Sequence, residues 1–356
     1  MTRWSAALVA LLLVPARVVA QGGVWEVEVH GGRSFIGAPS DGRGSVPDPG
    51  PPFTTATSLP SRRVSSWFLG DGAQLLNGSL AALGLSERIA ALDPVLDAPL
   101  VARQNGHSFG FRVGRDLTPR LAAEFSLDFT SHVVEIAAPV AAALEATSAS
   151  FTSAFRALLD AGPFTDLRVD STHAVVKVDT TQLVATGALS VDLLSRGRII
   201  PYATVGGGMI ANNGDAPRAG LEGHYSFDIA GGFPIAESDR VSLAHAVEDT
   251  VYFGMLGGGV KVFLAGRSGV RLDVRAHVGR NIIRTLVDAN SQVTQEVAGP
   301  LSDVIASFGV PSIQFSNDSA LGVSSLSGAD IQDFEGFRGS GTHRQVAVSV
   351  GYFWRF

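Results

Sequence analysis

Residues 345–356, QVAVSVGYFWRF, decide the fold because hydrophobic and polar side chains alternate along them almost without interruption. A period of two indicates a β-strand with a different environment on each side. One face carries Val346, Val348, Val350, Tyr352, Trp354 and Phe356. The other carries Gln345, Ala347, Ser349, Gly351 and Arg355, with Phe353 as the exception. The apolar face ends in aromatics and suits lipid with an interfacial girdle, whereas the small polar face suits a wet or ion-paired lumen.

Seven further segments show the same alternation, although it is weaker in the two glycine-rich ones. They are residues 24–30, 108–115, 120–129, 182–193, 201–210, 253–264 and 270–278. Most approach the roughly 9–11 residues that a tilted strand needs to cross a bilayer. The chain is therefore predicted to be all-β, an up-and-down antiparallel transmembrane β-barrel of about eight strands.

The connections between these segments alternate in length. The short ones are 116–119 (DLTP), 195–198 (SRGR) and 265–269 (AGRSG), all rich in turn-forming residues. The long ones run near 36–105, 131–180, 211–250 and 279–343. Outer-membrane barrels have short periplasmic turns and long extracellular loops. We therefore expect both termini on the periplasmic side and most of the chain outside the cell.

Loops of this length are expected to be partly structured. Residues 73–92, 137–159 and 301–308 are Ala/Leu-rich and predict short helices. Residues 173–180 extend the fourth strand beyond the membrane. Residues 225–229 suggest a further hairpin arm, so a ten-stranded barrel is the alternative. Only residues 38–60 are rich enough in Pro, Gly and Ser to predict mobility.

Residues 1–20 are predicted to be a secretory signal peptide, followed by a barrel domain over 21–356. Arg3 precedes the apolar run 6–14, which is too short to span a bilayer, and small residues precede Gln21. An uncleaved anchor is the alternative. The chain has no cysteine, so a closed hydrogen-bonded barrel must supply the stability that disulfides would otherwise give. A net charge of −6 argues against a nucleic-acid partner.

Strand parity places a nearly balanced set of charges inside the barrel. The set is Glu26, Glu28, Glu124, Asp128, Asp192 and Asp273 against Arg112, Lys261, Arg271, Arg275 and Arg355, with His30 and His277. An eight-stranded barrel is just wide enough for side chains to fill, and buried charges must be paired. We expect an ion-paired plug, with a narrow polar conduit as the alternative. Neither passes large solutes.

No catalytic, cofactor or metal-binding residues are assigned. A lipid deacylase would need His and Ser together on the lipid-facing surface, but His107 and Ser108 are adjacent and should point to opposite faces, as should Ser131 and His132. Asp128, His132 and Glu135 could suggest a protease-like rim, which an exposed polar rim explains better. No His spacing suits a metal, and the glycines at 206–208 and 257–259 indicate close strand packing. Residues 77–79 (NGS) formally match an N-glycosylation sequon, which carries no information about function in a bacterial protein.

Three motifs make the chain resemble small outer-membrane barrels related to the outer-membrane protein A and X and opacity-type families. They are the terminal VSVGYFWRF (348–356), Pro201-Tyr202 followed by glycines 206–208, and the hairpin GGGVKVFLAGRSGVRLDVR (257–275). The resemblance implies a Gram-negative outer membrane, contact with its lipid, and recognition of the strand ending at Phe356 by the assembly machinery. Since the chain ends at the barrel, a peptidoglycan-binding domain is not expected. The long loops depart from the family.

The expected function is a structural or surface-interaction role in the cell envelope, exerted through the long extracellular loops on an unknown surface ligand. A small porin-like channel for small solutes is the alternative. An enzyme, such as a lipid-modifying barrel, is the least favoured class.

Overall fold

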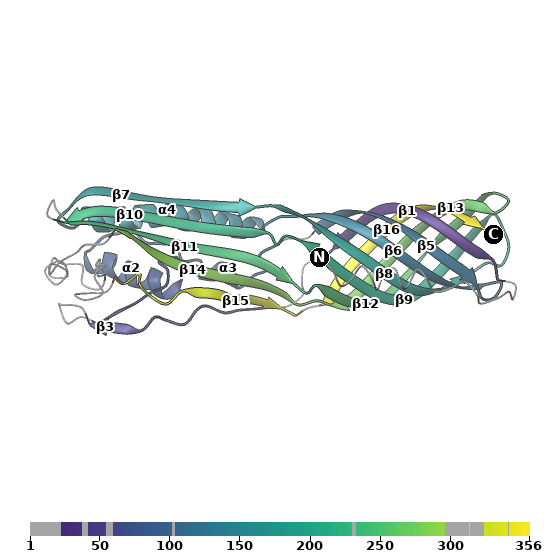
Figure 1. Ribbon diagram of the computed structural model, residues 1–356, viewed down its shortest axis with the longest axis horizontal. Coiled ribbons are helices and arrows are strands. Elements are labelled where there is room, and N and C mark those ends of the chain that lie inside the picture. Colours follow the sequence, from purple (N-terminus) through teal and green to yellow (C-terminus); the bar gives the residue numbers. More distant parts are fainter. Residues whose placement is uncertain are drawn as a thin grey trace.

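The computed structural model describes residues 23–37, 42–54, 60–101, 104–229, 233–295, 313, 324–340 and 342–356. The molecule is elongated, with a β-barrel at one end and a sheet with helices at the other (Figure 1). The predicted signal peptide (1–20) and the predicted helix 301–308 lie outside the described residues. Among those residues, no helix is both long and apolar enough to span a membrane.

The barrel is closed and contains eight strands, each antiparallel to both neighbours, in the order β1-β16-β13-β12-β9-β8-β6-β5. The strands are β1 (Trp25–Ile36), β5 (Gln104–Asp116), β6 (Leu121–Val134), β8 (Val178–Asp192), β9 (Ile199–Gly214), β12 (Thr250–Ala265), β13 (Ser268–Arg280) and β16 (Thr342–Arg355). Each matches one predicted segment. Two backbone hydrogen bonds of 3.0 Å between Trp25 and Phe356 help to close the ring. The eight-stranded prediction is confirmed.

The apolar face of residues 345–356 forms part of the outer surface of the barrel, and the polar face points into the lumen. Val350, Trp354 and Phe356 are exposed on the outside of the barrel, as are Phe109 and Leu256 on other strands. This apolar outer surface is what a barrel presents to acyl chains.

Phe353, the exception to the alternation, is fully buried. Its ring packs edge-on against Phe263, with 5.2 Å between the ring centroids. Gly269 leaves room for the ring, because a Cβ there would lie 2.5 Å from it. Phe353 therefore fills the lumen near the short-turn end, where a polar residue was expected.

A second sheet, of six strands, is built entirely from the long connections and has the order β2-β15-β14-β11-β10-β7. Its strands are β2 (Arg43–Gly44), β7 (Phe164–Val176), β10 (Arg218–Ile229), β11 (Phe233–Val247), β14 (Ile283–Gln295) and β15 (Ile331–Gly339). Strands β3 (Pro52–Thr54) and β4 (Pro60–Arg62) pair with each other in a separate antiparallel hairpin. The predicted arm 225–229 lies in β10, so the ten-stranded alternative is wrong.

The predicted extension at 173–180 belongs to two strands, since β7 ends at Val176 and β8 starts at Val178. The outer sheet thus continues upward from the barrel wall. Mobility of 38–60 stays a prediction, and the described part of that stretch includes β2 and β3.

Helices α2 (Gly70–Ala82), α3 (Asp93–Leu96) and α4 (Ala138–Asp160) belong to the same loops. The α4 prediction is confirmed. The prediction of short helical structure in 73–92 is confirmed as far as Ala82 and is wrong for 83–92, because Gly84 adopts φ +74°, the left-handed conformation that ends helices. Figure 1 shows α4 lying along β7 and β10 on one face of the sheet.

The six-stranded sheet and the three helices form one unit, here called the outer module, with its own hydrophobic core. Phe155 of α4 stacks on Tyr225 of β10 at 4.5 Å between ring centroids and meets Trp67 edge-on at 5.4 Å. Phe151 packs beside Phe155 at 4.7 Å. Aromatic pairs of this kind add to the area they bury. The loops therefore form a packed domain above the membrane.

Replacing Phe155 with Ala should destabilise the outer module by about 3–5 kcal/mol, because the change leaves a cavity under α4. The barrel should remain folded. In a Trp25→Phe/Trp354→Phe background, Trp67 fluorescence during urea unfolding reports on the module. The exposed neighbour Arg156→Ala is the control. An equal loss for both variants would contradict the assigned core.

Candidate functional site

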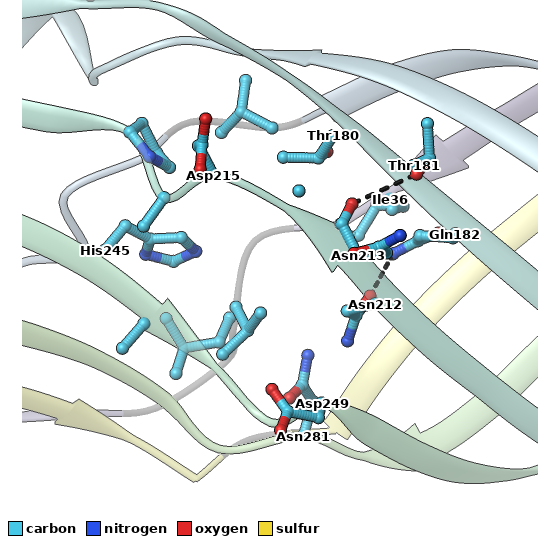
Figure 2. Close-up of a pocket in the computed structure, with 18 residues that line it drawn as sticks. Ile36, Thr180, Thr181, Gln182, Asn212, Asn213, Asp215, His245, Asp249 and Asn281 are labelled. Atoms are coloured by element: carbon cyan, nitrogen blue, oxygen red, sulfur yellow. Dashed lines mark hydrogen bonds between the residues drawn. The ribbon is translucent and has the colours of Figure 1, made fainter. Parts of the chain in front are cut away.

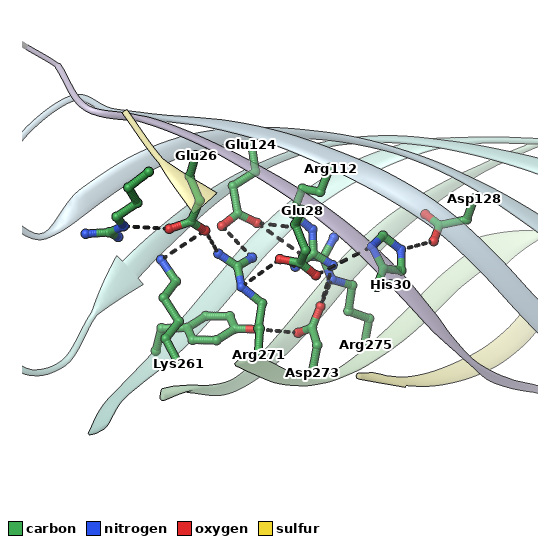
Figure 3. Close-up of polar contacts among 12 residues, drawn as sticks. Glu26, Glu28, His30, Arg112, Glu124, Asp128, Lys261, Arg271, Asp273 and Arg275 are labelled. Carbon is green, nitrogen blue, oxygen red and sulfur yellow. Dashed lines mark hydrogen bonds and ion pairs between the residues drawn. The ribbon is translucent and has the colours of Figure 1, made fainter. Parts of the chain in front are cut away.

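The lumen holds the charges that strand parity placed there, and those that Figure 3 labels form one connected network, the lumen plug, which Asp192 and Arg355 extend. Its members come from β1, β5, β6, β8, β12, β13 and β16, and each is buried or half-buried. The plug therefore ties together strands that lie far apart in the sequence. The predicted inward orientation of these side chains is confirmed.

Arg271 of β13 is the centre of the plug and is completely buried. Its Nη1 lies 3.0 Å from Glu124 Oε1, its Nε lies 3.0 Å from Glu28 Oε2, and its Nη2 contacts Glu26. A guanidinium can satisfy three carboxylates in this way because its donors are fixed in one plane. The Cζ atom of Arg271 also lies over the Tyr202 ring, 5.0 Å from the ring centroid.

A second layer of the plug surrounds Asp273. Its carboxylate accepts from Arg112 at 2.7 Å, from Arg275 at 2.6 Å and from the Tyr202 hydroxyl at 2.7 Å. Gly259 makes room for that hydroxyl, since a Cβ there would lie 2.7 Å from it. Sequence reasoning gave Tyr202 no role in the lumen. Its position on the inward face of β9 is the signal that could have placed it there.

The plug has an upper and a lower end. Toward the outer module, His30 Nε2 lies 2.5 Å from Asp128 Oδ1. Toward the short turns, Lys261 Nζ lies 3.4 Å from Asp192 Oδ1, and Arg355 Nε lies 2.8 Å from Glu26 Oε2. Above the plug, Ser34, Thr130 and Gln345 line a void of about 20 Å³ in the lumen. This part of the interior is filled by side chains.

A larger cavity, of about 260 Å³, lies where the barrel meets the outer module, and we call it the junction cavity (Figure 2). Thr180, Gln182 and Asn212 reach it from β8 and β9, His245 lines it from β11, and Asn281 lines it from the short link between β13 and β14. Nothing in the sequence pattern indicated it, because it depends on how four loops leave the barrel together.

The outer module contains a pair of fully buried acids on the inner face of β11. Asp239 Oδ2 accepts hydrogen bonds from the Trp67 amide at 2.6 Å and the Ser66 hydroxyl at 2.9 Å, while Glu237 accepts one from Tyr225. Burial raises the pKa of both carboxyls to about 7. These acids lie in the core, away from the lumen plug.

His107 and Ser108 point to opposite faces of β5, and Ser131 and His132 point to opposite faces of β6, as the sequence predicted. His107 and Ser131 lie directly opposite one another across β5 and β6, and both are exposed. In the described chain, neither hydrogen-bonds to the other and no carboxylate orients His107. His132 and Asp128 face the lumen instead, and Glu135 pairs with Lys177 at 2.7 Å. Within the described residues, no group of three or more His, Cys, Asp or Glu side chains could hold a metal.

No protein-family model and no curated protein matches this chain. Among solved structures, it is similar to the outer membrane protein OprG from Pseudomonas aeruginosa, with 11% identity, a TM-score of 0.36, and coverage of 92% of this chain and 95% of that one. An outer membrane channel from Pseudomonas putida F1 has 10% identity, coverage of 96% and 99%, and a TM-score of 0.23. The monoaromatic hydrocarbon channel CymD has 10% identity, coverage of 98% and 92%, and a TM-score of 0.18. Scores this low support no inference from those proteins to this one.

The barrel itself defines the class of protein. Its closed eight-stranded ring, apolar outer surface and ion-paired lumen are those of a protein that spans the outer membrane and contacts its lipid. The outer module extends beyond the long-loop end of the barrel.

Replacing Arg271 with Met should lower barrel stability by about 3–5 kcal/mol, because Glu26, Glu28 and Glu124 each lose a buried partner. Urea unfolding followed by Trp25 and Trp354 fluorescence measures this loss. Arg338→Met removes an exposed pair with Glu335 and should cost less than about 1 kcal/mol. Equal costs would show that the plug does not support the barrel.

The stability of the outer module should fall as pH rises from about 4 to about 7 and be level above that. The folded module keeps Asp239 and Glu237 protonated in this window, whereas the unfolded chain releases the protons. Asp239 alone should contribute on the order of 4 kcal/mol to the difference. The urea midpoint reported by Trp67 fluorescence at pH 5 and pH 8 measures it. Asp239→Asn should remove the share of the dependence that Asp239 contributes and leave that of Glu237, whereas the exposed Asp170→Asn should leave the whole dependence unchanged.

Proposed function

We propose that this protein is a plugged membrane anchor that displays a rigid surface-interaction module outside the cell. One observation carries the proposal: all four long connections fold together into a single packed domain, while the lumen below is filled by paired charges. A channel would not need such a domain. A display protein needs both the anchor and the rigid domain.

The contact surface that we propose is the sheet face not covered by α4. Along β10, the buried residues Leu221 and Tyr225 alternate with Glu222 and His224, which face away from the core. Glu222 pairs with Arg240 of β11 across this face at 2.9 Å, and both side chains are about half exposed or more. A broad sheet with mixed charge suits a polar macromolecular partner, since charge complementarity gives specificity.

A small-solute channel is the competing function, and the plug weighs against it. Arg271 and Lys261 are fully buried by neighbouring side chains, so a continuous water path would require the network to part. Parting it would leave charges unpaired in a region of low dielectric, which is expensive.

We further propose that the protein is exported and then inserted into the outer membrane. Residues 1–20 act as a cleaved signal peptide, and the aromatic strand ending at Phe356 is read by the outer-membrane assembly machinery. In this respect the barrel resembles the outer-membrane protein A and X and opacity-type groups. The protein acts by binding and carries out no catalysis.

Photo-crosslinking in intact cells tests the contact surface. A photoreactive amino acid in place of His224 should give a discrete higher-mass adduct. The same amino acid in place of Glu145, which is exposed on α4, should give none. Exchanging charges in Glu222→Lys/Arg240→Glu should abolish the adduct while the fold is kept. Adducts of equal yield from both positions, or none from either, would refute the proposal.

Planar-bilayer recording separates the anchor from the channel. The full chain should show no steady single-channel steps, because the lumen plug closes the barrel. Reproducible steps that Arg271→Met alters in size would favour the channel. A shift in gel mobility on heating confirms that the recorded protein was folded.

A further inference from the structure

The junction cavity is a built polar site that neither the plug nor the contact surface uses. Its volume of about 260 Å³ corresponds to about nine water molecules at ~30 Å³ each. That is just below the range of roughly 300–1,000 Å³ for drug-sized ligands. A molecule the size of one sugar ring fits this space.

A chain of hydrogen bonds fixes the orientation of Gln182 at the cavity wall. The backbone carbonyl of Glu248 can only accept, so the Asn212 group that lies 2.7 Å from it must be the Nδ2 donor. Asn212 Oδ1 must then accept from Gln182 Nε2, at 2.8 Å. The remaining oxygen, Gln182 Oε1, is an acceptor with no hydrogen-bond partner in the described part of the chain.

Two more buried side chains of the cavity wall carry atoms that have no hydrogen-bond partner among the described residues. They are Asn281 Oδ1 and His245 Nδ1. Gln182 is 9% exposed, Asn281 8% and His245 5%. Figure 2 shows the His245 ring pointing into the space between these residues. Buried polar atoms without partners are uncommon in native structures, and a ligand or water must satisfy them.

The charge distribution selects among ligands. The buried wall carries amides and an imidazole, and burial lowers the pKa of His245 to about 4, so the ring is neutral at neutral pH. The carboxylates of Asp215 and Asp249 lie on the exposed side of the cavity. A cation drawn to the buried wall would lose its water without gaining an ionised partner, which is costly. Hydroxyl groups can donate to the free oxygens without that cost.

Gly214 shapes the exposed side of the cavity. It adopts φ +133°, and a Cβ there would lie 3.1 Å from Thr180 Cα. This conformation strains other residues, and it occurs where β9 ends and the chain turns toward β10. The exposed neighbours Asn213 and Asp215 form the approach to the buried wall.

We propose that the junction cavity binds a small neutral polyhydroxylated ligand, of the size of a monosaccharide, through Gln182 and Asn281. The hydroxyls donate to the two free amide oxygens, and the carboxylates at the exposed side accept from outward-facing hydroxyls. This site is separate from the contact surface of the outer module, so either proposal can fail alone.

Ligand-observed NMR on the detergent-solubilised full chain tests the proposal, with D-glucose, D-galactose and N-acetylglucosamine as probes. At least one sugar should bind with saturation at millimolar concentration or below. Ethanolamine serves as the cationic probe and glycerate as the anionic probe, and both should bind more weakly. Binding of ethanolamine alone, or of no sugar, would overturn the proposal and leave a cation site or a water-filled junction.

Substitutions of residues that line the junction cavity test whether the sugar binds there. Gln182→Met and Asn281→Leu should each weaken it about fivefold, because each removes one acceptor of a neutral hydrogen bond. Val134→Phe, which enlarges a buried apolar side chain of the cavity wall without removing a polar group, should abolish binding. Gln292→Leu makes the same chemical change on the exposed face of β14 and should have no effect. Heat-dependent gel mobility checks folding. Sugar binding unchanged by all three cavity variants would place the site elsewhere and refute the proposal.

Discussion

A bilayer core offers no water to backbone amides, so each strand that crosses it must be hydrogen-bonded along both edges. That requirement closes the sheet between β1 and β16, and closure determines the rest of the molecule. A ring of eight strands leaves an interior of side-chain width, with no room for a wide aqueous pore. The side chains inside must then satisfy one another, as Arg271 and its carboxylates do.

The same closure explains the outer module. Strands that leave the barrel in antiparallel pairs are already twisted and in register, so their extensions can pair again above the membrane. β7 and β10 continue the wall formed by β8 and β9, and β11 and β14 join them there. Because this upper sheet does not close, one face must be covered, and α4 covers it with its apolar side. The barrel thus acts as a template for the domain it carries.

Among the described residues, the junction between the barrel and the outer module is filled neither by ion pairs nor by an aromatic core. The barrel below is packed with ion pairs, and the module above has an aromatic core. Between them Gln182, His245 and Asn281 are buried, and each has an atom with no hydrogen-bond partner in the part of the chain that the structure describes. Such incomplete satisfaction commonly marks function, since a fully satisfied wall would have nothing to offer a ligand. The contact surface, by contrast, is made of residues that solvent already satisfies.

The strand pattern around Phe356 by itself determined the barrel, its strand number and the side on which each charge lies, because a period of two encodes which face meets lipid. It could not explain Phe353, since the room for that ring comes from Gly269 of the neighbouring strand β13. It gave Tyr202 no role in the lumen, although that residue lies on the inward face of β9. It did not consider His107 together with Ser131, because their opposition arises from pairing between strands. Only the tertiary structure assembled the outer module and the junction cavity. Both depend on contacts between segments far apart in the chain, for which a local sequence pattern carries no signal.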